Sequence, residues 1–283
     1  MRDDAAVLIT SRHNPCVKRW RAWLEKGSVR RDADWALLEG PHLIEAALAA
    51  GWCIREVWYD ETGASRHAIL LDRLRAQHVT LVRVTAAVLT AVSDTTTPQG
   101  LIAEVAKPQW DVVHWGDGDL VIIDGVQEPG NVGALLRVAA AAGCAAAWLA
   151  PGSAHAWSPK VLRAAMGAHM VLPIFEGEVP DAVWQPYARE RRLLATVLSS
   201  ESRSLYSLDL TAPAAWVFGN EGAGVRSIWH ERRATPVILP LAPGIESLNV
   251  ATAAAVFLFE ARRQCTARRD SVDRSHSPRS RDR

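Results

Sequence analysis

The sequence predicts an α/β protein with two domains, a C-terminal domain built on a parallel sheet and a smaller N-terminal α/β domain. The chain has 283 residues, which is long enough for two domains, and 49% of them are hydrophobic, so a large buried core is expected. Short apolar segments alternate with segments of helical periodicity along most of the chain. The run LVIID at 120–124 is typical of a strand that is buried on both faces, as strands of parallel sheets are.

The N-terminal domain is expected to span residues 1–106 and to begin with a helix over residues 11–27. Asn14 and Pro15 favour a helix start, and the apolar and basic residues that follow fall on opposite faces. The basic face carries Lys18, Arg19, Arg21 and Lys26. Alternating apolar patterns then predict strands at 35–40, 54–60, 79–84 and 100–106, with helices near 41–50 and 65–77.

A proline and two glycines within residues 107–118 indicate a linker, after which the C-terminal domain is expected over residues 119–264. Its strands are predicted at 120–124, 145–150, 171–175, 193–198, 214–218 and 236–241, and its helices at 131–142, 158–168, 180–191, 224–233 and 248–263. This alternation implies a parallel sheet with helices on both faces. The Arg-rich tail at 265–283 has almost no apolar residues and is expected to be disordered.

The charge distribution is asymmetric, although the net charge is only +1. Residues 1–31 carry eight Lys/Arg against three Asp/Glu, and residues 262–283 carry eight Arg against three Asp. Basic ends favour a polyanionic partner such as RNA. They are equally compatible with simple solvation, because basic termini are common.

Cysteine usage and hydropathy indicate a cytoplasmic protein without a membrane segment. The four cysteines are scattered and form no CxxC, so neither a zinc site nor a disulfide framework is predicted. No apolar stretch reaches the length of a transmembrane helix, and the first residues contain no signal-peptide core. No metal is expected, because no His/Cys/Asp cluster has metal-ligand spacing.

Three loops combine polar residues with glycines at the points where predicted strands end. They are DGVQEPGNVGALLRVAAAAG at 124–143, FGNEGAG at 218–224 and LPLAPGIESLNV at 239–250. In open α/β sheets, ligands bind outside the carboxyl ends of the strands. Gly219, Gly222 and Gly224 are interpreted as points of close backbone approach to a ligand, and so are Gly130 and Gly133 beside Asn131. A single glycine loop more often forms only a tight turn. Three such loops in one domain predict one composite site.

The spacing of these loops excludes several common sites. No GxGxxG occurs and no acidic residue ends the second strand, which argues against a dinucleotide site. No GxxxxGK[ST] occurs, so a P-loop is absent from the sequence. Ser247 lacks a GxSxG context, which argues against an esterase nucleophile.

Together, these segments resemble the SpoU/TrmH family of RNA ribose methyltransferases, in the SPOUT class. The three family motifs are similar to residues 124–143, 219–222 and 247–250, and the stretch SPKVLRAAMGAHMVLPI at 158–174 is also family-like. The resemblance implies a SPOUT α/β domain with a parallel sheet, a deep trefoil knot near the C-terminus and a homodimer. Residues 11–106 resemble the family's RNA-binding extension, which implies a smaller L30e-like N-terminal domain.

The same resemblance implies S-adenosylmethionine as cofactor and carries site residues over motif by motif. The implied catalytic residues are Arg137, Asn131, Glu221, Ser247 and Asn249. The implied cofactor-binding residues are Gly219, Leu239, Leu248, Asn220 and Gly222. The basic residues expected to bind RNA are Lys18, Arg19 and Arg21.

The predicted function is therefore methylation of a ribose 2′-hydroxyl in structured RNA, with 23S-type rRNA as the first expectation and tRNA as the second. A guanidinium stays protonated in proteins, so Arg137 is expected to grip a phosphate or polarise the 2′-oxygen, and the general base is left unassigned. Asn131 and Ser247 taken singly could be plain helix caps. An RNA-binding protein with a decayed cofactor pocket is the alternative of a different class.

Overall fold

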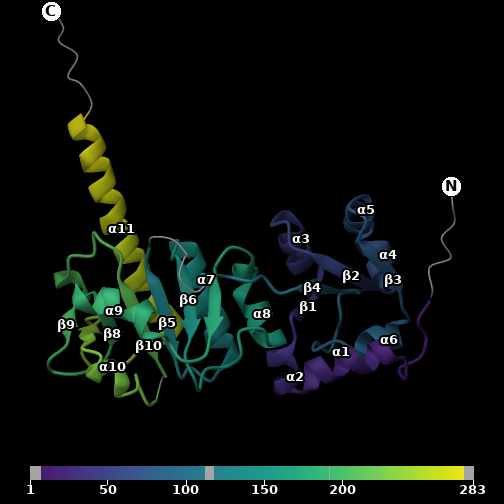
Figure 1. Ribbon diagram of the computed structural model, residues 1–283, viewed down its shortest axis with the longest axis horizontal. Coiled ribbons are helices and arrows are strands. Elements are labelled where there is room, and N and C mark those ends of the chain that lie inside the picture. The colour runs from purple at the N-terminus through teal and green to yellow at the C-terminus, as the bar shows by residue number, and fades with distance from the viewer. Residues whose placement is uncertain (1–7, 112–117, 191, 221, 277–283) are drawn as a thin grey trace, which may run out of the picture.

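The computed structural model describes residues 8–111, 118–190, 192–220 and 222–276. Two lobes lie side by side, each built around its own sheet (Figure 1). A four-stranded mixed sheet forms the N-terminal lobe and a seven-stranded parallel sheet forms the C-terminal lobe, which confirms the α/β prediction. Buried apolar side chains of both lobes belong to one continuous cluster, so the lobes share a core.

The N-terminal lobe places its strands in the order β1-β4-β2-β3, with β2 and β3 parallel and the other pairs antiparallel. Its elements are α1 (Pro15–Glu25), α2 (Gly27–Asp32), β1 (Trp35–Glu39), α3 (Pro41–Ala49), β2 (Ile54–Tyr59), α4 (Glu61–Arg66), α5 (Ala68–Ala76), β3 (Thr80–Arg83), α6 (Ala86–Ala91) and β4 (Leu101–Ala106). The Asn14 side chain caps α1 by accepting from the backbone N–H of Cys16 at 2.8 Å. The sequence analysis did not predict α6, because six residues are too few to display a helical period.

The C-terminal lobe places its strands in the order β7-β6-β5-β10-β8-β11-β9, and all neighbouring pairs are parallel. Its elements are β5 (Leu120–Asp124), α7 (Pro129–Ala142), β6 (Ala146–Leu149), α8 (Pro159–Ala165), η1 (Ala168–Met170), β7 (Ile174–Glu176), α9 (Asp181–Arg189), β8 (Leu193–Thr196), β9 (Arg203–Ser204), η2 (Leu205–Ser207), β10 (Ala215–Gly219), α10 (Ile228–Glu231), β11 (Thr235–Ile238) and α11 (Val250–His276). Every residue of β5 and β10 is buried, as the apolar run at 120–124 predicts.

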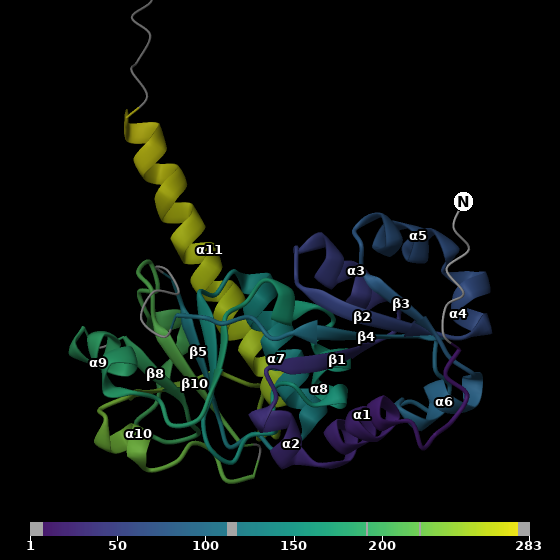
Figure 2. The same ribbon diagram turned by 45° about the vertical axis from the view of Figure 1, so that its right-hand side comes forward.

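The last helix corrects the prediction that the chain is disordered from residue 265. Helix α11 continues to His276 and projects away from the lobe (Figures 1 and 2), while residues 277–283 lie outside the described part of the chain. Gln264 accepts a hydrogen bond from the backbone N–H of Leu210 at 2.9 Å, and the Cys265 thiol donates to the carbonyl of the same residue. Because the buried first half of α11 nucleates the helix, adding further helical residues costs little free energy. None of the helices in the described ranges is long and apolar enough to cross a bilayer.

A packed junction next to the linker joins the two lobes. Lys107 donates from Nζ to the carbonyl oxygens of Arg30 and Ala33, each at 2.7 Å, and its ammonium group lies 5.5 Å from the ring centre of Trp157. Trp157 also lies against Trp52 of the N-terminal lobe, with ring centres 6.0 Å apart. Burial lowers the pKa of Lys107 by penalising the charged amine. These contacts compensate for part of that cost and hold the lobes together.

Acid should destabilise the fold through His169, which lies 5.0 Å from Trp157 between ring centres. Its Nε2 donates to the carbonyl oxygen of Ala156 at 2.8 Å, and its buried Nδ1 has no partner among the described residues. Burial lowers the pKa of His169 from 6.5 to about 4. Between these two pH values the unfolded chain takes up a proton that the native chain does not. The stabilisation is therefore complete above pH 6.5 and falls by about 3 kcal/mol as the pH drops to 4.

Urea denaturation of the wild type and of His169→Gln at pH 7 and pH 4.5 checks this expectation. Glutamine can keep the hydrogen bond to Ala156 but does not titrate, so the loss of stability on acidification should be smaller in the variant. The same loss in both proteins would mean that His169 is not the group that responds to pH.

Candidate active site

The carboxyl ends of the neighbouring strands β8, β10 and β11 open onto a cavity. Its larger part measures about 480 Å³ and adjoins a smaller part of about 120 Å³, and together they fall in the range typical of small-molecule sites. The residues that line both parts are Thr196, Val197, Leu198, Ser247, Leu248 and Ala253. The cavity therefore lies where the loops after these strands meet.

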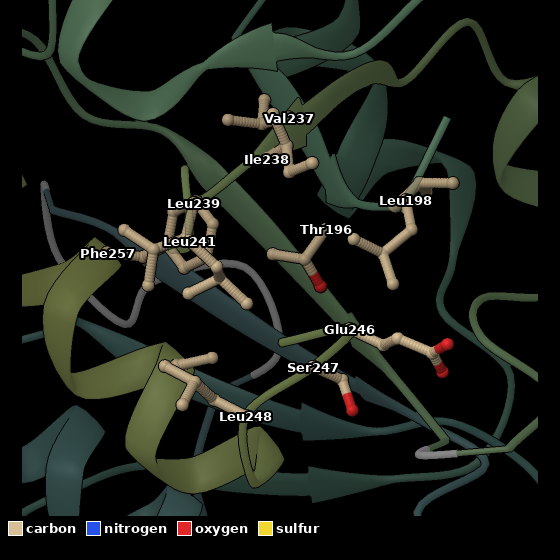
Figure 3. A pocket seen from close by; sticks show the side chains of 12 residues that line it. Thr196, Leu198, Val237, Ile238, Leu239, Leu241, Glu246, Ser247, Leu248 and Phe257 are labelled. Carbon is tan, nitrogen blue, oxygen red and sulfur yellow. The ribbon is translucent and has the colours of Figure 1, made fainter. Parts of the chain in front are cut away.

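One side of the cavity is apolar and the other carries oxygen atoms (Figure 3). Leu239, Leu241 and Phe257 form the apolar side. Glu246 and Ser247 present a carboxylate and a hydroxyl from the loop that precedes α11. This lining suits a ligand that has both an apolar ring and a cationic or polar portion.

The second loop forms a wall of closely packed backbone. A side chain at Gly219 would place its Cβ 2.3 Å from the carbonyl carbon of Gly224 and 2.5 Å from the nitrogen of Val225, so only glycine fits. Asn220 and Gly224 exchange two backbone hydrogen bonds, at 3.0 and 2.9 Å. The Asn220 side chain also accepts from two backbone N–H groups further along the loop. These contacts fix the described residues of the loop, and Gly219, Asn220, Gly222 and Gly224 line the cavity.

A buried carboxylate that the sequence analysis did not single out fastens this loop to the sheet. Asp124, the last residue of β5, accepts from the backbone N–H of Arg226 at 2.7 Å and from its Nε at 2.6 Å. The Asp124 side chain is fully buried, so this charge is neutralised by Arg226. Asp124 opens the first family-like segment, but only the pairing of β5 with β10 brings it to the loop.

Hydrogen bonds tie the three predicted loops to one another. The Asn249 side chain donates to Oδ1 of Asn131 at 2.8 Å, which joins the third loop to the first. The Asn220 side chain donates to the carbonyl oxygen of Gly125 at 3.1 Å, which joins the second loop to the first. Asn249 also caps α11, because its Oδ1 accepts from the backbone N–H of Ala251 at 3.0 Å. The convergence predicted from sequence is thus present in the structure.

The structure places the five residues expected to bind the cofactor on the wall of this cavity. Gly219, Asn220, Gly222 and Leu248 line its larger part, and Leu239 and Leu248 line its smaller part. These residues were predicted from two separate loops, and the sheet brings them together because β10 and β11 both flank β8.

The residues expected to be catalytic are distributed less evenly. Ser247 lines the cavity, and Asn131 and Asn249 form the hydrogen bond between loops. Arg137 lies on an exposed face of α7 and is not among the described residues that line the cavity. Glu221 lies outside the described residues.

One glycine of the first loop has a different role from the one predicted. A Cβ at Gly133 would lie 2.5 Å from Cβ of Ala164 and 2.7 Å from the carbonyl oxygen of Val161. Gly133 therefore permits close packing of α7 on α8, and the interpretation that it approaches a ligand was wrong. The reason is that Gly133 lies on the face of α7 that packs against α8, which the sequence pattern does not reveal.

Two basic residues of helix α1 form ion pairs within the protein. Arg19 donates from two nitrogens to the buried carboxylate of Glu104 and lies 4.8 Å from the ring centre of Trp35. Arg21 pairs with Glu25 at 3.0 Å on the exposed surface. Lys18 is exposed on the same helix. Arg19 thus neutralises Glu104 in addition to any contact with RNA.

The sequence analysis missed several residues of the cavity wall. Thr196 is the last residue of β8, Leu198 lies in the segment after it, and His230 lies on α10. For Thr196 and Leu198 the signal is their position at the carboxyl end of a strand, and that signal becomes useful only when the strand order is known. In the part of the chain that the structure describes, no group of three or more His, Cys, Asp or Glu side chains could hold a metal ion.

Two family models match the chain, one in each lobe. Residues 119–259 match the SpoU rRNA methylase family, and residues 14–103 match an MRM3-like substrate-binding domain. The first match covers all three loops of the cavity. The second covers α1, the strands β1, β2 and β3, and the first half of β4.

Similar proteins match over nearly the whole chain. An uncharacterized tRNA/rRNA methyltransferase of Synechocystis is 36% identical, over 90% of this chain and 93% of that protein. The 23S rRNA 2′-O-methyltransferase RlmP of Bacillus subtilis is 31% identical, over 90% of this chain and 98% of that protein. A crystal structure of an AdoMet-bound rRNA methyltransferase from Sinorhizobium meliloti has a TM-score of 0.75 at 28% identity, covering 91% of this chain and 97% of that one.

Proposed function

Because the chain belongs to the SpoU rRNA methylase family, we propose that it methylates a ribose 2′-hydroxyl of the large-subunit rRNA. It is an RNA 2′-O-methyltransferase and takes S-adenosylmethionine as its methyl donor. The observation that carries the proposal is that the second and third loops line one cavity, while the first loop is joined to them by the Asn249–Asn131 and Asn220–Gly125 hydrogen bonds. The N-terminal lobe offers a second surface for folded RNA, which proteins recognise mainly by shape and phosphate contacts.

The cavity fits the methyl donor. Leu239 and Leu248 give an apolar surface for an adenine ring, and Gly219, Asn220 and Gly222 line the larger part of the cavity, where their backbone can meet a polar portion of the ligand. Glu246 contributes a carboxylate that favours a cationic ligand such as a sulfonium. When bound, the cofactor supplies an electrophilic methyl group.

The side chains around the cavity can orient the acceptor. The amide of Asn249 fixes Asn131, so that the start of α7 is held against the loop before α11. We assign to Arg137 the grip on the phosphate next to the methylated ribose, since a guanidinium binds phosphate through two parallel hydrogen bonds. Ser247, which lines the cavity, is assigned a hydrogen bond to the substrate. Holding the hydroxyl in line can contribute about 7–11 kcal/mol to lowering the barrier.

The position of Arg137 supports a homodimer. In a single chain Arg137 is exposed on α7 and away from the cavity wall that the structure describes. Arg262 of α11 donates to the carbonyl oxygen of Ala141 at 2.7 Å, which sets α11 beside α7. Phe259 lies about one turn before Arg262 on α11 and is 47% exposed. Arg137 lies about one turn before Ala141 on α7. A second copy packed on Phe259 would cover this apolar side chain and could bring its own Arg137 to the cavity.

Replacing Phe259 with glutamate should convert the dimer into a monomer and abolish methyl transfer, because a buried charge at an interface is costly. Light scattering at micromolar concentration and a methylation assay measure the two effects. Ile69→Glu is the matched control, since Ile69 is 80% exposed in the N-terminal lobe and should tolerate the change. A monomeric wild type at this concentration would refute the dimer.

A trefoil knot and a cytoplasmic location complete the proposal. Strand β11 lies on the side of β8 opposite to β10, so the chain crosses β8 between residues 219 and 235 before α11 packs against α7. This path supports a knot formed by the loops at 218–224 and 239–250 and by α11. The four scattered cysteines, which form no disulfide, support a reducing compartment.

Transfer of a tritiated methyl group from S-adenosylmethionine tests the proposal. Purified 23S rRNA and tRNA, both lacking the modification, are incubated with the full chain, and labelled nucleotides are mapped. We expect a single labelled ribose in 23S rRNA. Labelling of tRNA alone would identify tRNA as the substrate, and binding of RNA without any transfer would favour a non-catalytic protein.

A further inference from the structure

Helix α8 lies between the N-terminal lobe and the loop that carries Asn131. In Figures 1 and 2 it is on the side of the C-terminal lobe that faces α1, α2 and β1. Its residues contact β1 on one side and α7 on the other. Because this seven-residue helix contacts both lobes, a shift of the N-terminal lobe would also shift α7.

On the side of the N-terminal lobe, α8 is held by an ion pair. Nη2 of Arg163 donates to Oδ2 of Asp94 at 2.7 Å, and the two side chains are only 34% and 39% exposed. Asp94 is itself fixed, because its backbone N–H donates to Glu39 at 3.1 Å. Arg163 also borders a narrow apolar crevice with Leu24 and Leu43. Because the pair is partly buried, removing one of its two charges should cost more free energy than it would in a fully exposed pair.

On its other side, α8 packs closely against α7, the helix that carries Asn131. The missing side chain of Gly133 lets the two helices touch, because a Cβ there would lie 2.7 Å from the carbonyl oxygen of Val161. Lys160 at the start of α8 pairs at 2.6 Å with Glu128, which caps α7 through the backbone N–H of Gly130. A shift of α8 therefore moves the first turn of α7, where Asn131 lies.

We propose that Asp94 and Arg163 are positioning residues for methyl transfer. Through α8, their ion pair sets the distance between the N-terminal lobe and the first turn of α7, which carries Asn131. The inference rests on the proposed function, because it requires that the RNA be held by both lobes. Displacement of a substrate by about 1 Å can lower the rate by about 100-fold. An ion pair at the lobe junction can thus determine which ribose reaches the cavity.

Charge reversal and charge exchange test this inference. In the full-length protein, Asp94→Arg and Arg163→Asp should each lower kcat on 23S rRNA by about tenfold or more, while the Kd for S-adenosylmethionine stays that of the wild type. The double variant with both changes should recover most of the lost rate. Asp72→Arg is the control, because the Asp72–Arg75 pair is exposed and lies within the N-terminal lobe. Wild-type kcat in both single variants, or no recovery in the exchanged pair, would overturn the inference.

A measurement without RNA separates this inference from the proposed function. Spin labels on Ile69→Cys and Tyr206→Cys, both exposed sites, report the distance between lobes in a Cys16→Ser/Cys53→Ser background. The wild type and the exchanged pair should give one narrow distance distribution, and each single variant a broader one. Equal widths in all four proteins would refute the inference even if methylation is observed. A wild type that methylates no RNA would refute the proposed function, while the distances would still show whether the ion pair sets the spacing of the two lobes.

Discussion

Replacing Arg137 with alanine should lower kcat for methyl transfer by about 100- to 1,000-fold while leaving the affinity for S-adenosylmethionine nearly unchanged. Arg137 is exposed on α7 and is not among the described residues of its own chain that line the cavity, so its truncation leaves the wall that we assign to the cofactor intact. It removes the charge that we assign to the substrate phosphate. Single-turnover methylation of 23S rRNA and calorimetric titration of the cofactor measure the two quantities separately.

Two further variants sharpen this test. Arg137→Lys keeps the charge but cannot form two parallel hydrogen bonds, so its kcat should fall between the wild type and the alanine variant. Arg189→Ala, on the exposed end of α9, should behave as the wild type. An equal loss of rate and of cofactor affinity in Arg137→Ala would show that Arg137 supports the fold instead of acting on the substrate.

Replacing Gly219 with alanine should raise the Kd for S-adenosylmethionine at least tenfold and reduce the free energy of unfolding by about 1–3 kcal/mol. The added Cβ would lie 2.3 Å from the carbonyl carbon of Gly224, and this backbone atom can move only if the loop moves. The loop is held by Asp124 through Arg226 and by the Asn220–Gly125 hydrogen bond, so its displacement also disturbs the first loop. Isothermal titration and urea denaturation measure the two effects.

The matched control is Gly27→Ala, at the start of α2. A Cβ at Gly27 would have as its nearest neighbour the flexible end of Arg31 at 3.5 Å, so the change should be tolerated. Wild-type cofactor affinity in Gly219→Ala would show that the second loop is not part of the cofactor site.

The sequence predicted those parts of the site in which a family motif coincides with the end of an apolar run. Gly219, Asn220 and Leu248 were carried over from the motifs of the SpoU/TrmH family, which coincide with loops at the ends of apolar runs, and the structure places all three on the cavity wall. Thr196 and Leu198 were missed, because β8 lies between β10 and β11 only through a crossing of the chain that periodicity cannot reveal.

Two errors of the sequence analysis have physical causes that recur in other proteins. Gly133 was assigned to ligand contact because glycine permits close approach, but the close neighbour is α8. Residues 265–276 were assigned to disorder because they lack apolar side chains, but a helix that is already nucleated extends through arginine and alanine, which are good helix formers. The composition of a segment does not show whether a helix directly precedes it in the chain.

The hydrogen bond from Asn249 to Asn131 joins residues that are 118 positions apart, and it has a consequence for biosynthesis. During translation the first loop leaves the ribosome long before its partner exists, since domains are made from the N-terminus at about 5–20 residues per second. A nascent or prematurely terminated chain that stops before Asn249 therefore has no binding pocket for the donor. Methylating capacity should arise only once the final helix has emerged, and truncated products should be inert toward ribosomes that are assembling nearby.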